Sequence, residues 1–285
     1  MPDLINLGGS PVKKSQLDHL TFNRAFLYGE GFFETMRKSN GAFPLWHYHW
    51  SRIEKSAQFF GMDRDSLVNK ESLQEHLISS TATHDNASVK ILFYTEGTGK
   101  YAGSMKRLRC IINAKPLHSP SPIWPENGLI VDYSERSIIP AGAPYGFVKK
   151  TSALPYVIAD REKEERELDE LLLLNTDGDI AESIYHNVFI YKDKTYITPP
   201  LSSGCVQGTA RALIIDHLKS NNQNITEQKI DKNAIQSAEE VFLTNGLRII
   251  QPVKKIGKSK TLPIRKSVTL FNNICENLFL QKDLI

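Results

Sequence analysis

A cluster of prolines near the middle of the chain sets the strongest limit on its fold. Pro116, Pro120, Pro122 and Pro125 fall within ten positions. Proline fixes its own backbone torsion and has no N–H to donate, so neither a helix nor a central strand can continue through this segment. A chain of 285 residues is also long enough for two domains. We therefore predict an N-terminal domain at residues 1–118, a linker at 119–125 and a C-terminal domain at 126–285.

The first predicted domain mixes helices with strands. Asn40-Gly41 is typical of a hairpin turn, here within residues 31–46, because both residue types tolerate a left-handed backbone. Apolar residues at helical spacing, with Gly61 as a stop, predict a helix directly after it. The elements expected in this domain are helices at 47–62 and 71–82 and strands at 87–96 and 107–117.

The second predicted domain is richer in long strands. Pro155 suits the first turn of a helix whose cap is Thr151 or Ser152. The other expected elements are strands at 128–135, 145–150 and 169–175, a hairpin within 183–200, a helix at 209–220 and strands within 238–253. The predicted fold class is α+β, with a small α/β N-terminal domain and a larger α/β C-terminal domain.

Composition excludes several classes of protein. The net charge is +3 and the basic residues are spread along the chain, so we expect no nucleic-acid partner. Three widely spaced cysteines without a CxxC pair indicate a reducing compartment and no structural zinc site. Apolar runs such as 171–174 are far too short to span a bilayer, and the first ten residues do not resemble a signal peptide. We expect a cytoplasmic protein without a membrane segment.

Two adjacent lysines, Lys149 and Lys150, stand out from the other basic residues. They follow an apolar stretch that includes Phe147 and Val148, and a charged helix comes after them. A solvated pair is the ordinary reading of such lysines. If 145–150 is a strand, its alternation sends the two side chains to opposite faces, so only one of them can enter a site.

Several segments, taken in order, resemble the fold-type IV pyridoxal-phosphate enzymes. This family comprises branched-chain and D-amino acid aminotransferases and aminodeoxychorismate lyase. The resemblance implies a pseudo-barrel-like C-terminal domain, pyridoxal 5′-phosphate as cofactor, a small-molecule substrate and a homodimer. The segments that carry it are FLYGEGFFETMR, HWSR, DGDIAESIYHNVFI, YITPPLSSGCVQGTAR and EVFLTNGLRIIQPV, together with the lysine and its helix.

The resemblance identifies one lysine as the catalytic residue. Registering the family's apolar triplet on residues 157–159 selects Lys149, and a register shifted by one residue selects Lys150. The lysine amine condenses with the cofactor aldehyde and later moves a proton at the substrate Cα. Glu182 matches the partner of the pyridine nitrogen, with Asn187 five residues later. This chain has the bulkier residues 184–186 where the family has small ones.

The resemblance also identifies residues that are expected to bind the cofactor phosphate. Arg52 matches the family's phosphate-binding arginine, with His49 as its support. Gly208, Thr209 and Ala210 open a helix, and a helix N-terminus binds anions. Threonine is frequent in the family where Ala210 stands, so Thr209 is expected to replace that hydroxyl. His47 and His49 lack carboxylate or thiol partners at ligand spacing, so we expect no metal site.

The residues expected to contact the substrate distinguish the lyase from the aminotransferases less clearly. The resemblance implies that Phe33 and Asn245 contact the substrate. Arg37, Lys100 and Arg107 are each a candidate to hold a substrate carboxylate, because arginine binds it by two hydrogen bonds and lysine as a point charge. A solvated side chain is the alternative for each of the three. Asn245-Gly246 alternatively forms a type I′ turn with no further role. The asparagine favours 4-amino-4-deoxychorismate lyase, which eliminates pyruvate to give 4-aminobenzoate. A branched-chain or D-amino acid aminotransferase and a non-catalytic binding protein with this fold are the alternatives.

Overall fold

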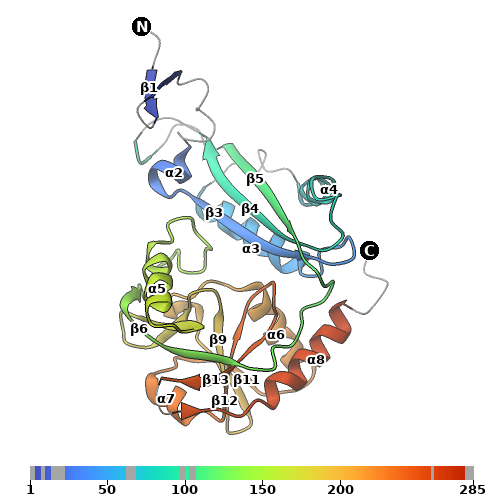
Figure 1. The fold of residues 1–285 in the computed structure, drawn as a ribbon, viewed down its shortest axis with the longest axis vertical. Helices are drawn as coiled ribbons and strands as arrows, with labels where there is room; N and C mark the ends of the chain where they lie inside the picture. Colours follow the sequence, from blue (N-terminus) through green and yellow to red (C-terminus); the bar gives the residue numbers. More distant parts are fainter. Residues whose placement is uncertain are drawn as a thin grey trace.

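The computed structural model describes residues 4–7, 10–13, 23–61, 69–96, 100–102, 107–257 and 260–279. These residues form a small antiparallel sheet and a large mixed sheet, each with helices packed on it (Figure 1). A two-stranded hairpin, β1 (Leu4–Leu7) and β2 (Ser10–Lys13), precedes them. The predicted α+β fold class is confirmed. The boundaries at 118, 119–125 and 126 stay a prediction, and the chain passes from the small sheet to the large one within residues 117–128.

The small sheet has three antiparallel strands in sequence order. Its elements are α2 (Arg24–Tyr28), β3 (Gly31–Lys38), α3 (Trp46–Phe59), α4 (Lys70–Ser80), β4 (Ala87–Glu96) and β5 (Arg107–Pro116). Phe32 and Met36 point from one face of β3 into a core with Ile53 of α3 and Leu77 of α4. Alternating burial along β3 therefore fixes which side chains point the other way, toward the large sheet.

Asn40 and Gly41 both have a left-handed backbone, with φ of 49° and 84°. This geometry confirms the predicted turn. The returning arm is short, however: it makes the single bridge Ser39↔Ala42 before α3 begins. The long partner of β3 is β4, whose paired residues lie 49 to 63 positions away in sequence.

The large sheet has nine strands in the order β11-β10-β9-β12-β13-β6-β7-β8, with β14 paired to β13. Its strands are β6 (Leu129–Ile139), β7 (Glu170–Asn175), β8 (Ile180–Ser183), β9 (Asn187–Lys192), β10 (Thr195–Thr198), β11 (Ile225–Glu227), β12 (Glu240–Thr244), β13 (Gln251–Ile256) and β14 (Lys260–Thr261). Its helices are α5 (Leu154–Glu165), α6 (Thr209–Ser220), α7 (Lys232–Ser237) and α8 (Lys266–Phe279). Helix α6 matches its prediction, whereas α2, α7 and α8 were not predicted.

The strand predicted at 145–150 is wrong. Residues 144–147 form a turn, and Lys150 makes only an isolated bridge to Phe32. Phe33 N donates to Lys149 O at 2.9 Å, and Thr151 N donates to Gly31 O at 2.9 Å, so β3 holds the segment in place. Without a regular strand, the two lysines are not forced to opposite faces.

The helix that follows starts later than predicted. Thr151 does not cap it, because its hydroxyl donates to the carbonyls of Gly29 and Gly31. The N-cap is Ala153, and Pro155 lies in the first turn as expected. The start of α5 is therefore set by contacts with the small sheet and not by a local cap.

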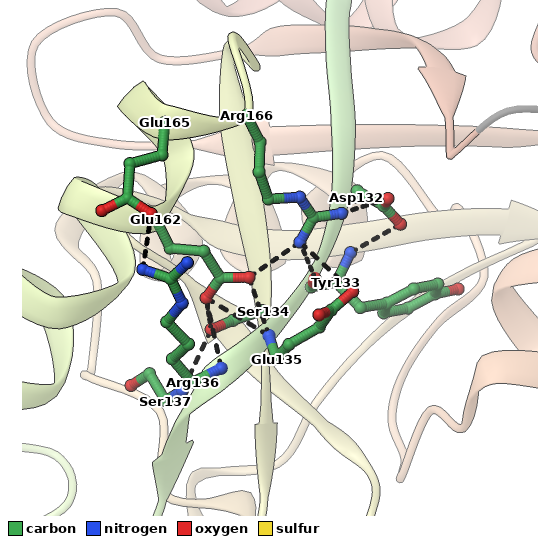
Figure 2. A network of polar contacts seen from close by, with 9 residues as sticks. All are labelled: Asp132, Tyr133, Ser134, Glu135, Arg136, Ser137, Glu162, Glu165 and Arg166. Carbon is green, nitrogen blue, oxygen red and sulfur yellow. Dashed lines mark hydrogen bonds and ion pairs between the residues drawn. The ribbon is translucent and has the colours of Figure 1, made fainter.

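A buried carboxylate fastens α5 to the large sheet. Figure 2 shows Glu162 of α5 reaching the irregular part of β6, where the register with β7 shifts. Glu162 is only 1% exposed and accepts from Ser134 Oγ at 2.7 Å, from Glu135 N at 2.9 Å and from Arg136 N at 3.2 Å. These backbone groups would otherwise lack partners at the bulge, and each buried unpaired group costs about 1–3 kcal/mol.

No described helix is both long and apolar enough to cross a membrane. Within the same part of the chain, no three His, Cys, Asp or Glu side chains are grouped so that they could hold a metal ion.

Candidate active site

A cavity of about 420 Å³ lies where the two sheets meet. Its walls come from β3, α3, β4, the segment before α5, the start of α5, β8, the start of β9, the N-terminus of α6 and the turn after β12. The predicted site residues that line it are Phe33, Arg52, Lys149, Glu182, Asn187, Gly208, Thr209 and Asn245. The volume suits a ligand of cofactor size.

Lys149 and Lys150 both line the cavity. The Lys149 Nζ lies 4.9 Å from the ring centroid of Phe33, whereas the Lys150 Nζ lies 5.3 Å from that of Tyr145. Burial lowers the pKa of Lys149, and the nearby Arg52 charge lowers it further. A lowered pKa increases the fraction of neutral amine, which is the nucleophilic form.

Glu182 lies at the floor of the cavity on β8 and is 3% exposed. Its Oε1 accepts from Tyr156 Oη at 2.5 Å, and its Oε2 accepts from Val206 N at 3.1 Å and Asn187 Nδ2 at 3.3 Å. Burial raises the pKa of Glu182, although these hydrogen bonds and the Lys149 charge oppose the rise. A cationic group placed against this carboxylate would restore its ionised form.

Asn187 and Gly208 fit each other so closely that position 208 must be glycine. A Cβ at Gly208 would lie 1.8 Å from Asn187 Oδ1. Asn187 in turn donates to Val206 O at 2.8 Å, so it ties β9 to the loop that leads into α6. Helix α6 begins directly after Gly208, which provides no side-chain cap. The first N–H groups of the helix are therefore available to an anion.

Thr209 lines the cavity, and Ala210 is fully buried behind it. The expected replacement of a family threonine by Thr209 stays a prediction, although the cavity does reach that residue.

Arg52 is held from behind by a carboxylate that sequence reasoning missed. Glu34 is completely buried and accepts from Arg52 Nε at 2.8 Å and Nη2 at 2.6 Å. His49 Nδ1 lies 2.6 Å from the same carboxylate, as expected for a residue that supports the arginine. Arg52 Nη1 donates to Gln207 O at 2.9 Å, next to Gly208. The guanidinium is thus fixed beside the N-terminus of α6.

Among the predicted carboxylate-binding residues, Arg37 and Lys100 do not line the cavity. Arg37 instead braces the two sheets, because its Nε donates to Leu247 O at 2.9 Å and its Nη1 donates to Ser119 O at 2.8 Å. Lys100 is exposed. The side chain of Arg107 lies outside the described residues. Lys90 of β4 does line the cavity and was not predicted; it lies 4.6 Å from the Phe33 ring centroid.

The type I′ turn expected at Asn245-Gly246 is wrong, since neither residue has a positive φ. Asn245 Oδ1 instead accepts from Leu247 N at 3.1 Å and Arg248 N at 2.9 Å. The side chain folds back on its own turn, an arrangement common for asparagine. Its Nδ2 makes no hydrogen bond within the described part of the chain.

The residues fit pyridoxal 5′-phosphate. The cavity holds the half-buried Lys149, whose amine has no hydrogen-bond partner among the described residues, and the buried carboxylate of Glu182. An arginine and an uncapped helix N-terminus supply donors for a phosphate. Lys149 would hold the cofactor aldehyde and Glu182 the ring nitrogen. Arg52 and the start of α6 would together hold the phosphate.

Three proteins show what this chain is similar to. Aminodeoxychorismate lyase of Bacillus subtilis is 28% identical over 261 residues, covering 89% of this chain and 86% of the relative. A Methanocaldococcus jannaschii protein provisionally named a branched-chain-amino-acid aminotransferase is 24% identical, covering 88% and 87%. The crystal structure of the Thermoproteus uzoniensis branched-chain aminotransferase superposes with a TM-score of 0.81 at 19% identity, covering 96% and 94%, and shows the same fold.

The family model described as amino-transferase class IV matches residues 31–256. This range includes every cavity-lining residue named above, from Phe33 to Leu247. The chain therefore belongs to the class IV aminotransferase family.

Proposed function

We propose that this pyridoxal 5′-phosphate enzyme is a 4-amino-4-deoxychorismate lyase, which eliminates pyruvate from its substrate and releases 4-aminobenzoate. The observation that carries the proposal is the presence of Asn245 in the same cavity as Lys149, Glu182 and Arg52. The aminodeoxychorismate lyase of Bacillus subtilis, similar over most of both chains, supports the same reaction.

The proposed roles follow from the positions of the side chains. When bound, the cofactor supplies a ring that accepts electrons from the substrate carbon that loses its proton. Lys149 would hold the cofactor aldehyde and would take and return that proton. Glu182 would pair with the ring nitrogen, and Tyr156 and Asn187 fix the carboxylate in place. Arg52 and the N-terminus of α6 would bind the phosphate.

One assay distinguishes the lyase from the aminotransferase. The purified, cofactor-loaded protein is incubated with 4-amino-4-deoxychorismate, and separately with branched-chain or D-amino acids plus 2-oxoglutarate. The lyase proposal predicts equal amounts of pyruvate and 4-aminobenzoate in the first incubation and little glutamate in the second. Glutamate formation without pyruvate release would reject it.

The aminotransferase is the second candidate because the relative from M. jannaschii carries that activity in its name. Both reactions begin with removal of a proton from the carbon that carries the substrate amine, so Lys149, Glu182 and Arg52 would serve either one. The two candidates therefore differ only on the substrate side of the cavity.

Asn245→Asp tests the substrate side. Aspartate keeps an oxygen that can accept from Leu247 N and Arg248 N, so the turn should be retained. It loses the amide donor and adds a negative charge. If Asn245 contacts an anionic substrate, kcat/KM for the lyase reaction should fall by about tenfold or more. A change of less than about twofold would limit Asn245 to its role in the turn.

We also propose a homodimer, as expected from the resemblance. Phe26 and Tyr101 are 72% and 86% exposed, and Tyr28 is 42% exposed next to them. Exposed aromatic side chains in one area favour a protein interface. Phe22, predicted with this group, lies outside the described residues. Light scattering at assay concentrations should give twice the chain mass of 32.2 kDa, and a monomeric active protein would reject the dimer.

A further inference from the structure

A second cavity, of about 390 Å³, lies next to the one that holds Lys149 and Glu182. Its walls come from the ends of α2, α3 and β6 and from the segment that leads into α5. Val148, Lys150 and Tyr156 line both cavities, so these three residues form the wall between them. The proposed reaction takes place in the first cavity and leaves the second without a role.

The second cavity is lined mainly by aromatic and aliphatic side chains. Phe59 and Phe60 lie at the end of α3, with their ring centroids 5.6 Å apart and their planes at 76°. Ile139 and Pro140 add aliphatic surface. Phe59 and Tyr145 are 42% and 41% exposed, so the rim of the cavity is open to solvent. Such a lining suits a flat aromatic ring, which can pack against the edge or the face of another ring.

Lys150 gives this lining a positive charge. Its Nζ lies 5.3 Å from the ring centroid of Tyr145, which lines the second cavity and not the first. Within the described part of the chain, the ammonium makes no hydrogen bond or ion pair. Burial lowers the pKa of Lys150, and the charge of Glu182 in the first cavity opposes this effect. A carboxylate in the second cavity would give the half-buried ammonium a direct partner.

We propose that the second cavity binds a single-ring aromatic monocarboxylate, with its ring against Phe59 and Phe60 and its carboxylate on Lys150. The identity of this ligand rests on the proposed function, because 4-aminobenzoate, the product of the proposed reaction, has this chemistry. The enzyme thus binds its own product outside the cavity in which the product is formed.

Bound product would act on Glu182 through the charge of Lys150. Burial raises the pKa of Glu182, and the Lys150 charge is among the influences that lower it. A carboxylate on Lys150 cancels much of that charge, so Glu182 takes up a proton more readily. A protonated Glu182 supports a cationic ring nitrogen poorly. Accumulated product therefore slows the reaction without competing with the substrate.

Calorimetric titration of the cofactor-loaded enzyme tests the site without turnover. The probes are 4-aminobenzoate and 4-aminobenzamide, which share a ring and differ in charge. Wild type should bind the acid about tenfold more tightly than the amide, the effect of one charged hydrogen bond. Equal binding of the two probes would overturn the inference.

Lys150→Met removes the charge and keeps a side chain of similar length. It should weaken the acid about tenfold and change the amide by less than about twofold. Lys115→Met is the matched control, because Lys115 is an exposed lysine on β5 that lines neither cavity. An equal loss in the control would overturn the inference, since the effect would then come from net charge alone.

Two phenylalanine variants identify the cavity that binds the acid. Phe59 lines only the second cavity and Phe33 lines only the first. Phe59→Ala should weaken the acid about fivefold, the effect of one lost ring contact, and Phe33→Ala by less than about twofold. A loss in Phe33→Ala as large as that in Phe59→Ala would place the acid in the first cavity and overturn the inference.

Steady-state kinetics tests the effect on the reaction. Added 4-aminobenzoate should lower kcat with little change in KM, and Lys150→Met should abolish this inhibition. Inhibition that raises KM alone would contradict the inference, because product and substrate would then share one cavity. The site and the proposed reaction can fail separately. Turnover without Phe59-dependent binding rejects only the second site, whereas such binding without turnover of aminodeoxychorismate rejects only the lyase.

Discussion

Replacing Glu34 by glutamine changes the charge behind the cavity with almost no change in size. The carboxylate lies within 2.6–2.8 Å of Arg52 Nε, Arg52 Nη2 and His49 Nδ1. A glutamine amide accepts through one oxygen only, and its NH₂ group would face another donor. The substitution therefore leaves the Arg52 guanidinium, which is 5% exposed, without its counter-charge.

The lowered pKa of Glu34 gives the size of its contribution to the free energy of unfolding. Burial alone would raise this pKa, but the Arg52 charge and the hydrogen bonds from His49 and Arg52 lower it from 4.5 to about 2. At about 1.4 kcal/mol per pKa unit, the difference corresponds to about 3 kcal/mol of folding free energy at neutral pH. Because the folded-state pKa is the lower one, this stability is present above about pH 4.5 and is lost as the pH falls toward about 2.

Urea denaturation of the cofactor-free protein measures this contribution. At pH 7, Glu34→Gln should lower the free energy of unfolding by about 3 kcal/mol, and the difference from wild type should shrink at about pH 3. Glu54→Gln, which changes an exposed acid on the same helix as Arg52, should cost less than about 0.5 kcal/mol. A Glu34→Gln penalty below about 1 kcal/mol, or one that does not depend on pH, would refute the reasoning.

The same variant tests the proposed role of Arg52. Glu34→Gln should weaken pyridoxal 5′-phosphate about tenfold, because the arginine is no longer held beside the start of α6. Pyridoxal, which lacks the phosphate, should lose much less affinity. Equal losses for the two compounds would show that Arg52 does not act on the phosphate.

Two further variants test the floor of the cavity. Glu182→Gln should keep the cofactor bound but slow exchange of the substrate Cα proton by about tenfold to a thousandfold, because an amide supports a cationic ring nitrogen poorly. Unchanged exchange, followed by NMR in deuterated water, would remove Glu182 from that role. Gly208→Ala should lower both cofactor affinity and the free energy of unfolding, the latter by about 1–3 kcal/mol, because the new Cβ displaces Asn187. Wild-type values in both measurements would contradict the fit between Asn187 and Gly208.

Local sequence signals predicted several elements correctly. Asn40-Gly41 forms the turn that its residue types favour, and residues 209–220 form a helix with the predicted bounds. Helix α8 could also have been predicted, because Leu270, Phe271 and Ile274 recur at helical spacing and are buried. These features depend on residues close together in the sequence.

Features that depend on distant contacts were missed. The segment at 145–150 reads as a strand, but contacts with β3 hold it as a turn and a single bridge. Lys90 enters the cavity only because β4 pairs with β3, which brings it beside Phe33. The buried partner of Glu34, in contrast, could have been predicted from the sequence. Glu34 alternates with the apolar Phe32 and Met36 on the buried face of β3, and an acid on an apolar face needs a buried partner.

The most direct test of the account is to identify the lysine that carries the cofactor. Borohydride reduction makes the lysine–cofactor linkage permanent, and proteolysis with tandem mass spectrometry then locates the added mass. We predict that the pyridoxyl phosphate group is on Lys149, that Lys149→Ala loses it and that Lys150→Ala retains it. Modification of Lys150 alone, or of neither lysine in a protein that turns over substrate, would contradict the proposed site.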